Sequence, residues 1–121
     1  MLKRTAGRED YLLRIIRQAA ESIQRLREML MASADASPHV RQEVHSSTQR
    51  LLGVQAALLT RLDAETAVRL VGSRSRAQLW ANLVELEADA CDCAGDTIEG
   101  TRHRVRAAAL RAAADELELD A

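Results

Sequence analysis

An uninterrupted helical repeat in the first third of the chain places the strongest constraint on the fold. Between Glu9 and Met31, apolar residues recur at alternating spacings of four and three, at Leu12, Ile16, Ala19, Ile23, Leu26 and Leu30. This spacing puts them on one side of an α-helix, whose turn contains 3.6 residues. Tyr11 and Ile15 widen the apolar stripe at its start. The sequence therefore predicts an amphipathic helix from about Glu9 to Met31 that packs on other helices.

The composition also favours helices over strands. The chain has 121 residues, of which 47% are hydrophobic, but it contains no phenylalanine, one tyrosine, one tryptophan and one proline. Aromatic residues favour strands and proline interrupts helices, so their scarcity favours an all-α protein. A chain of this length is enough for one core. We therefore expect a single helical domain over residues 1–121, with a flexible N-terminus at 1–8 and a frayed C-terminus at 118–121.

Capping residues divide the middle of the chain into further helices. Ser37 followed by Pro38 is typical of an N-cap and a helix start, and Gly53 is typical of a helix end, which predicts a helix over 38–52. The segment 54–72 is less regular, and it forms either two short helices or one bent helix. Within it, Asp63 and Gly72 are expected to begin and end a short helix.

The segment from Ser75 to Ala94 carries two adjacent apolar stripes, one through Leu83 and the other through Trp80. A helix with two apolar stripes packs on both sides, so this one should be central. After a Gly-Asp turn, a last helix over 97–117 is expected to bury Ile98, Val105, Ala108, Ala109, Ala112 and Leu117. The sequence thus predicts an antiparallel helical bundle with about four main helices plus one or two short ones.

Charged residues follow the same division. Acidic residues dominate 85–99, whereas arginines dominate 102–111. In an antiparallel hairpin these two blocks face each other, and such exposed pairs mainly set the register of the helices.

Three segments carry a family resemblance. They are the opening helix Glu9-Asp10-Tyr11-Leu12-Leu13-Arg14, the segment Leu51-Leu52-Gly53 with Leu62-Asp63-Ala64-Glu65-Thr66, and the hairpin from Leu83 to Ala113 that turns at Gly95-Asp96. Together they resemble a family of small bacterial helical proteins of uncharacterised function with tetratricopeptide-like helix pairs. The chain departs from a tetratricopeptide unit because Glu87 stands near the usual tyrosine, the closing proline is missing, and no 34-residue period is evident. The resemblance implies tetratricopeptide-like helix hairpins and no activity.

The residue types that carry chemistry do not form a convincing reactive site. Cys91 and Cys93 are two apart, so on a helix they point roughly 200° away from each other, whereas zinc sites prefer cysteines with two residues between them. His103 is the nearest histidine, and whether Cys91, Cys93 and His103 have a redox or metal role stays open. No glycine-rich phosphate loop is present. We therefore expect no enzyme, no metal site and no cofactor.

Charge gives no strong indication of nucleic acid or membrane binding. The formal net charge is −1, and no segment is long and apolar enough to span a membrane. The opening Met1-Leu2-Lys3-Arg4 is followed by polar residues instead of the apolar core of a signal peptide, so we expect a cytoplasmic protein. The alternative to a protein-binding module is a nucleic-acid-associated regulator, which would use the basic residues near the N-terminus, namely Lys3, Arg4, Arg8, Arg14 and Arg17.

The most favoured function is a non-enzymatic module for protein–protein interaction or oligomerisation. The seam of the first helix is long enough to pack within the chain and to pair with a second copy or another protein. A groove between the first helix and the closing hairpin is a second possible docking surface. The candidate interface residues are Tyr11, Ile15, Ile16, Ile23 and Trp80, although core packing is the alternative for Trp80.

Overall fold

The computed structural model describes residues 2–117, which contain no strand. The four long helices are α1 (Leu2–Ala32), α2 (Ser37–Leu52), α5 (Arg74–Cys93) and α6 (Thr97–Asp115). The shorter elements are the 3₁₀ helices η1 (Ala34–Ala36) and η2 (Gly53–Gln55) and the α-helices α3 (Ala56–Leu59) and α4 (Ala64–Val71). The prediction of an all-α bundle with four main and two short α-helices is confirmed. The predicted fraying at 118–121 lies outside the described residues.

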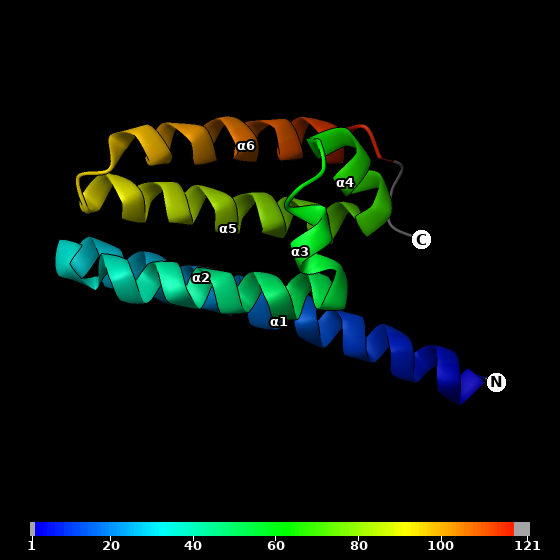
Figure 1. The fold of residues 1–121 in the computed structure, drawn as a ribbon. Helices are drawn as coiled ribbons and strands as arrows, with labels where there is room; N and C mark the ends of the chain where they lie inside the picture. The colour runs from blue at the N-terminus through cyan, green and yellow to red at the C-terminus, as the bar shows by residue number, and fades with distance from the viewer. Residues whose placement is uncertain (1, 118–121) are drawn as a thin grey trace.

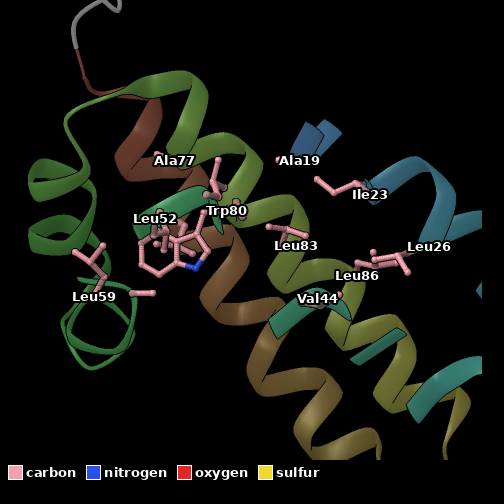
Figure 2. Packing of buried hydrophobic residues seen from close by; sticks show 14 of the residues in the cluster. Ala19, Ile23, Leu26, Val44, Leu52, Leu59, Ala77, Trp80, Leu83 and Leu86 are labelled. Carbon is pink, nitrogen blue, oxygen red and sulfur yellow. The ribbon is translucent and has the colours of Figure 1, made fainter. Parts of the chain in front are cut away.

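The four long helices run in alternating directions, and α5 lies in the middle of them (Figure 1). It contacts α6 on one side and the α1–α2 pair on the other. Both apolar stripes face the α1–α2 pair, since Leu83 points toward α1 and Trp80 lies near the end of α2 (Figure 2). The side of α5 that meets α6 is a third face, with Ala88 against Gly100, so α5 is central as predicted, but its two stripes do not cover opposite neighbours. The short helices α3 and α4 connect α2 to α5 at one end of the bundle, so the segment 54–72 forms two short helices rather than one bent helix.

Helix α1 is longer than predicted and extends beyond the bundle. It begins at Leu2 and not near Glu9, so the segment that we expected to be a flexible N-terminus is helical from Leu2 onward. At 1.5 Å per residue, the 31 residues of α1 span about 46 Å, whereas the 16 residues of α2 span about 24 Å. The N-terminal part of α1 consequently projects past the end of α2 (Figure 1).

The apolar seam of α1 packs against α5. Its fully buried members are Ala19, Ile23, Leu26 and Leu30. Figure 2 shows Ile23 and Leu26 pointing toward Leu83 and Leu86 of α5. The spacing of four and three that is visible in the sequence thus becomes the contact surface between the first helix and the central helix.

Trp80 anchors the other part of the core, where α5 meets the end of α2 and the short helix α3. Its side chain is only 1% exposed, and it lies near Leu52 and Leu59 (Figure 2). The guanidinium of Arg106 from α6 lies over the indole, 5.4 Å from the ring centroid. A buried tryptophan removes a large apolar area from water, so this position contributes strongly to stability.

Apart from the start of α1, most predicted helix ends are found in the structure, and Ser37 is the other exception. The Asp63 side chain accepts a hydrogen bond from the backbone of Thr66 at the start of α4, and Gly72 ends that helix in the left-handed conformation. These backbone and side-chain bonds to Thr66 lower the pKa of Asp63. Ser37, however, is not the N-cap of α2. It lies in the first turn, and its hydroxyl donates to the carbonyl of Ala34.

The predicted buried face of α6 is wrong. Ile98 and Val105 are 76% and 66% exposed, respectively. The three alanines that were also expected inside are exposed, namely Ala108, Ala109 and Ala112, and Leu117 is half-buried. The face that meets α5 instead consists of Gly100, Ala107, Leu110 and Ala114. Small residues dominate this face, which allows α5 and α6 to approach closely.

The α5–α6 hairpin is also held by ion pairs between the acidic and basic blocks. Arg104 lies 2.8 Å from Asp89 and 2.5 Å from Asp92, and Arg111 lies 2.8 Å from Glu85. The hydrogen bond from Arg111 lowers the pKa of Glu85, and the bonds to Asp92 and Asp89 raise the pKa of Arg104. These groups are partly solvated, so they fix the register more than they stabilise the fold. The predicted facing of the two blocks is confirmed.

Long-range arginine contacts hold the ends of three helices. Arg76 donates two hydrogen bonds to the carbonyl of Leu51 at the end of α2, and Arg74 donates to three carbonyls at the end of α6. Arg106 donates to the carbonyl of Leu59 at the end of α3. A cation at a helix C-terminus satisfies free carbonyls and complements the helix dipole.

Replacing Gly100 with alanine is expected to lower the free energy of unfolding by about 1–2 kcal/mol, even though alanine favours helix. A Cβ atom at this position would lie 2.2 Å from the Oδ1 atom of Asp92 and 3.2 Å from the carbonyl oxygen of Ala88. The first contact forces Asp92 away from Arg104, and the second pushes on the backbone of α5. Urea denaturation followed by circular dichroism measures the change.

The matched control for this variant is Gly7→Ala, because Gly7 is also helical and a Cβ atom there meets nothing within 4 Å. We expect no loss of stability in that variant. A Gly100→Ala variant as stable as the wild type would show that α5 and α6 do not approach closely at Gly100.

Candidate functional site

The projecting part of α1 carries apolar side chains that the bundle does not cover. Tyr11 and Leu13 are 57% and 56% exposed. Leu12, Ile15 and Ile16 are half-buried, in contrast to the fully buried seam farther along the helix. The apolar side chains of α1 become fully buried only where the helix meets its neighbours. Its N-terminal part projects past α2, so the side chains there stay partly exposed (Figure 1).

A groove of about 610 Å³ lies between this part of α1 and the C-terminal end of α2. We call it the α1–α2 groove, and its lining residues are Tyr11, Arg14, Ile15, Gln18, Gln49, Arg50, Gly53, Val54, Ala56 and Ala57. Ile15, Val54 and the two alanines make much of the lining apolar. Arg14 and Arg50 are the charged lining residues, and none of the lining residues is acidic. The groove therefore combines an apolar surface with a positive charge.

The structure separates the five candidate interface residues into two groups. Tyr11 and Ile15 line the α1–α2 groove, and Ile16 is half-buried beside it on the same helix. Ile23 and Trp80 are 5% and 1% exposed and belong to the core, so they do not form a surface. An amphipathic pattern identifies the apolar face of a helix but does not distinguish its covered part from its uncovered part.

A second concave region, which we call the polar cleft, lies between α2, α5 and α6 and has a volume of about 340 Å³. Val44, Trp80 and Val84 are its apolar lining residues, and of these only Val84 is half-buried, since Val44 and Trp80 are 2% and 1% exposed. The polar lining residues are His45, Thr48, Thr60, Glu87, Glu99, Arg102, His103 and Arg106. The sequence did not indicate this cleft, because its residues come from four separated segments that only the folded bundle brings together.

Most charges around the polar cleft are paired. Glu99 lies 2.9 Å from Arg102, and Glu87 lies 3.6 Å from Arg41. The Nε2 atom of His103 lies 3.8 Å from a carboxylate oxygen of each glutamate. The Glu99 and His103 side chains are four residues apart on one face of α6, which places both at the cleft.

The two cysteines face different environments. Cys91 is fully buried, and burial raises the pKa of its thiol, whereas Cys93 is exposed. A raised pKa keeps the Cys91 sulfur protonated and poorly nucleophilic. His103 lies at the polar cleft instead of with the cysteines. Within residues 2–117, no three histidine, cysteine, aspartate or glutamate side chains are placed to hold one metal ion.

The basic N-terminal cluster is described only in part. Arg14 and Arg17 are exposed on α1, whereas the side chains of Lys3, Arg4 and Arg8 lie outside those that the structure describes. Nucleic-acid binding through this cluster stays a prediction. Among the described residues, no helix combines the length and the hydropathy needed to cross a membrane.

Comparison with known proteins adds no relative to this description. No protein-family model matches the chain, and neither a curated protein nor a solved structure does. The resemblance to small bacterial proteins with tetratricopeptide-like helix pairs accordingly stays a prediction, and the candidate function rests on the geometry of the α1–α2 groove and the polar cleft.

Proposed function

We propose that the protein is a non-enzymatic interaction module whose α1–α2 groove binds an amphipathic, acidic helix of another protein. The observation that carries this proposal is an open groove with an apolar lining, two arginines and no acidic lining residue. Grooves of this kind bind the apolar face of a helix through residues spaced three and four apart. The groove volume of about 610 Å³ suits a few such side chains.

Charge determines which kind of helix fits. Arg14 lies on α1 and Arg50 on α2, so the two guanidinium groups come from the two helices that border the groove. Carboxylates on the flanks of a bound helix would meet an arginine from either helix. Charge complementarity of this kind increases the association rate and excludes basic partners.

A second copy of the chain is a poorer occupant than an acidic partner. The projecting part of α1 is itself rich in basic residues, since residues 1–17 include Lys3, Arg4, Arg8, Arg14 and Arg17. Two such segments placed in each other's grooves would bring like charges together, which is unfavourable. We therefore expect the protein alone to leave the groove open.

Catalysis is not part of the proposal. The hydroxyls of Thr48 and Thr60 at the polar cleft donate to the backbone carbonyls of Val44 and Ala57, so neither is held as a nucleophile by a histidine. The buried, unpaired Cys91 thiol is consistent with a reducing compartment, and we propose a cytoplasmic location on that basis.

Replacing Val54 with glutamate is expected to weaken binding of an acidic helix by about tenfold or more, because it adds a like charge and removes apolar surface. Val54 lines the groove and is fully exposed, so the change leaves the core intact. The probe is a labelled peptide that repeats Glu-Leu-Glu-Glu-Leu-Leu-Glu, and fluorescence anisotropy measures its dissociation constant. A peptide with lysine in place of glutamate is expected to bind much more weakly.

The control variant is Val105→Glu, which makes the same change at an exposed valine of α6 away from the groove. It should bind the acidic peptide like the wild type. Equal binding of the acidic and basic peptides, or equal losses in the Val54 and Val105 variants, would remove the support for this groove and this partner chemistry.

A further inference from the structure

Beyond the docking groove, the polar cleft contains a cation with an unusual environment. Arg106 lies at the cleft, half-buried, with its guanidinium over the ring of Trp80. It donates one hydrogen bond, to the carbonyl of Leu59 at 3.1 Å. A guanidinium has five N–H donors, so this bond uses only a small part of its capacity.

Arg106 differs from its neighbours on α6 in its ion pairing. Arg102, Arg104 and Arg111 each lie within 3 Å of a carboxylate. In the part of the chain that the structure describes, no carboxylate lies within ion-pair distance of Arg106, and Asp63 acts on it only from farther away. Burial lowers the pKa of the Arg106 guanidinium. A half-buried cation of this kind gains most from an anion that comes from outside the chain.

The two glutamates at the cleft do not remove the preference of Arg106 for an anion from outside the chain. Glu99 is paired with Arg102, and Glu87 is paired with Arg41, while His103 lies 3.8 Å from both. Their charges are therefore compensated locally, but they still disfavour a ligand with two or more negative charges. A singly charged anion fits this balance better than a phosphate.

The rest of the lining indicates what the anion should be attached to. Val84, which is half-buried, is the apolar lining residue that a ligand can reach, because Val44 and Trp80 are 2% and 1% exposed. The cleft volume of about 340 Å³ is at the small end of ligand sites. The hydroxyl of Thr48 already donates to the carbonyl of Val44, so toward a ligand it acts as an acceptor. A short apolar body with one anionic end is the ligand shape that matches this lining.

We propose that the polar cleft binds a small organic monocarboxylate, with the carboxylate on Arg106 and the apolar body against Val84. Arginine binds carboxylates through two parallel N–H···O bonds, which gives geometric selectivity over other anions. The carboxylate has two sources, a free short-chain acid or the C-terminal end of a peptide, and both present the same group.

The single tryptophan of the chain provides the readout, because Trp80 lies directly beneath Arg106. The probe is butyrate, and its uncharged isostere butyramide is the matched ligand control. We expect a saturable change in Trp80 fluorescence with a dissociation constant on the order of 1 mM, as befits a ligand of six heavy atoms. Butyramide and inorganic phosphate should bind at least about tenfold more weakly. N-acetylvaline distinguishes the two sources: tighter binding than butyrate assigns a peptide end, and equal or weaker binding assigns a free acid.

Replacing Arg106 with glutamine is expected to weaken butyrate binding by about tenfold or more, whereas Arg69→Gln, on the exposed surface of α4, should leave it unchanged. Circular dichroism checks folding, because Arg106 also bonds Leu59. If that variant does not fold, NMR signals of the Arg106 side chain in the wild type decide the question, and they should shift with butyrate but not with butyramide. The proposal is overturned by no saturable response, by equal binding of butyrate and butyramide or phosphate, or by a folded Arg106→Gln variant that binds like the wild type.

Discussion

Replacing Trp80 with alanine is expected to lower the free energy of unfolding by about 3–5 kcal/mol, the largest effect of any single truncation that we anticipate. The indole is 1% exposed and lies among side chains from α2 and α3 as well as α5. Removing it leaves a cavity that the surrounding helices fill only in part, and it also removes the ring beneath Arg106. Because domains of this size are stable by only about 5–15 kcal/mol, the variant should unfold at much lower urea concentration.

The control is Tyr11→Ala, which removes the only other large aromatic side chain of the chain. Tyr11 is 57% exposed and should change the unfolding free energy by less than about 1 kcal/mol. Circular dichroism during urea denaturation measures both variants. Similar small losses in the two variants would show that Trp80 is a surface anchor rather than a core residue.

The second large effect is expected for Leu26→Ala, with a loss of about 2–5 kcal/mol. Leu26 is fully buried where α1 meets α5, so the truncation tests the contact that joins the first helix to the bundle. Met31→Ala is the matched control on the same helix, because Met31 is 83% exposed and its loss should cost little. If both variants were equally stable, α1 would not pack on α5 through its seam.

The positions of the long helices could be predicted because their apolar spacing is regular and their ends carry strong signals. Asp63 and Gly72 bracket α4 as expected, since a carboxylate satisfies free N–H groups at a helix start and glycine adopts the left-handed conformation at a helix end. The central position of α5 was expected from its two apolar stripes, although both stripes face the α1–α2 pair and α6 packs on a third face. In each case, the information is local in the sequence.

The buried face of α6 could not be predicted in this way, because alanines surround the helix. With alanine at 107–109 and 112–114, no side of the helix is clearly more apolar than the others, and the bulkier Ile98 and Val105 led to the wrong prediction of the inner face. The structure buries small residues instead, because they allow α6 to approach α5 closely at Gly100. Close packing therefore determines this face more than hydrophobicity does.

The candidate sites depend even more on contacts that the sequence does not reveal. Arg106 bonds a carbonyl 47 residues away, and the polar cleft combines four separated segments. Only Tyr11 and Ile15 of the α1–α2 groove were anticipated, because they lie on the predicted apolar stripe. The expected docking groove was between the first helix and the closing hairpin, whereas no residue of α5 or α6 lines the α1–α2 groove. Its other side, from Gln49 to Ala57, follows from the way in which η2 and α3 turn away from α2, and no pattern in the sequence indicates that.

The most direct test of the proposed function is an NMR titration of the isotope-labelled protein with the acidic Glu-Leu peptide. We expect backbone shifts to concentrate at the α1–α2 groove, around Arg14, Arg50 and Val54, while the exposed outer face of α6 stays unchanged. The lysine peptide should cause little change at the same concentrations. Shifts located elsewhere, no shifts, or a protein whose groove is already closed by a second copy would contradict the proposal.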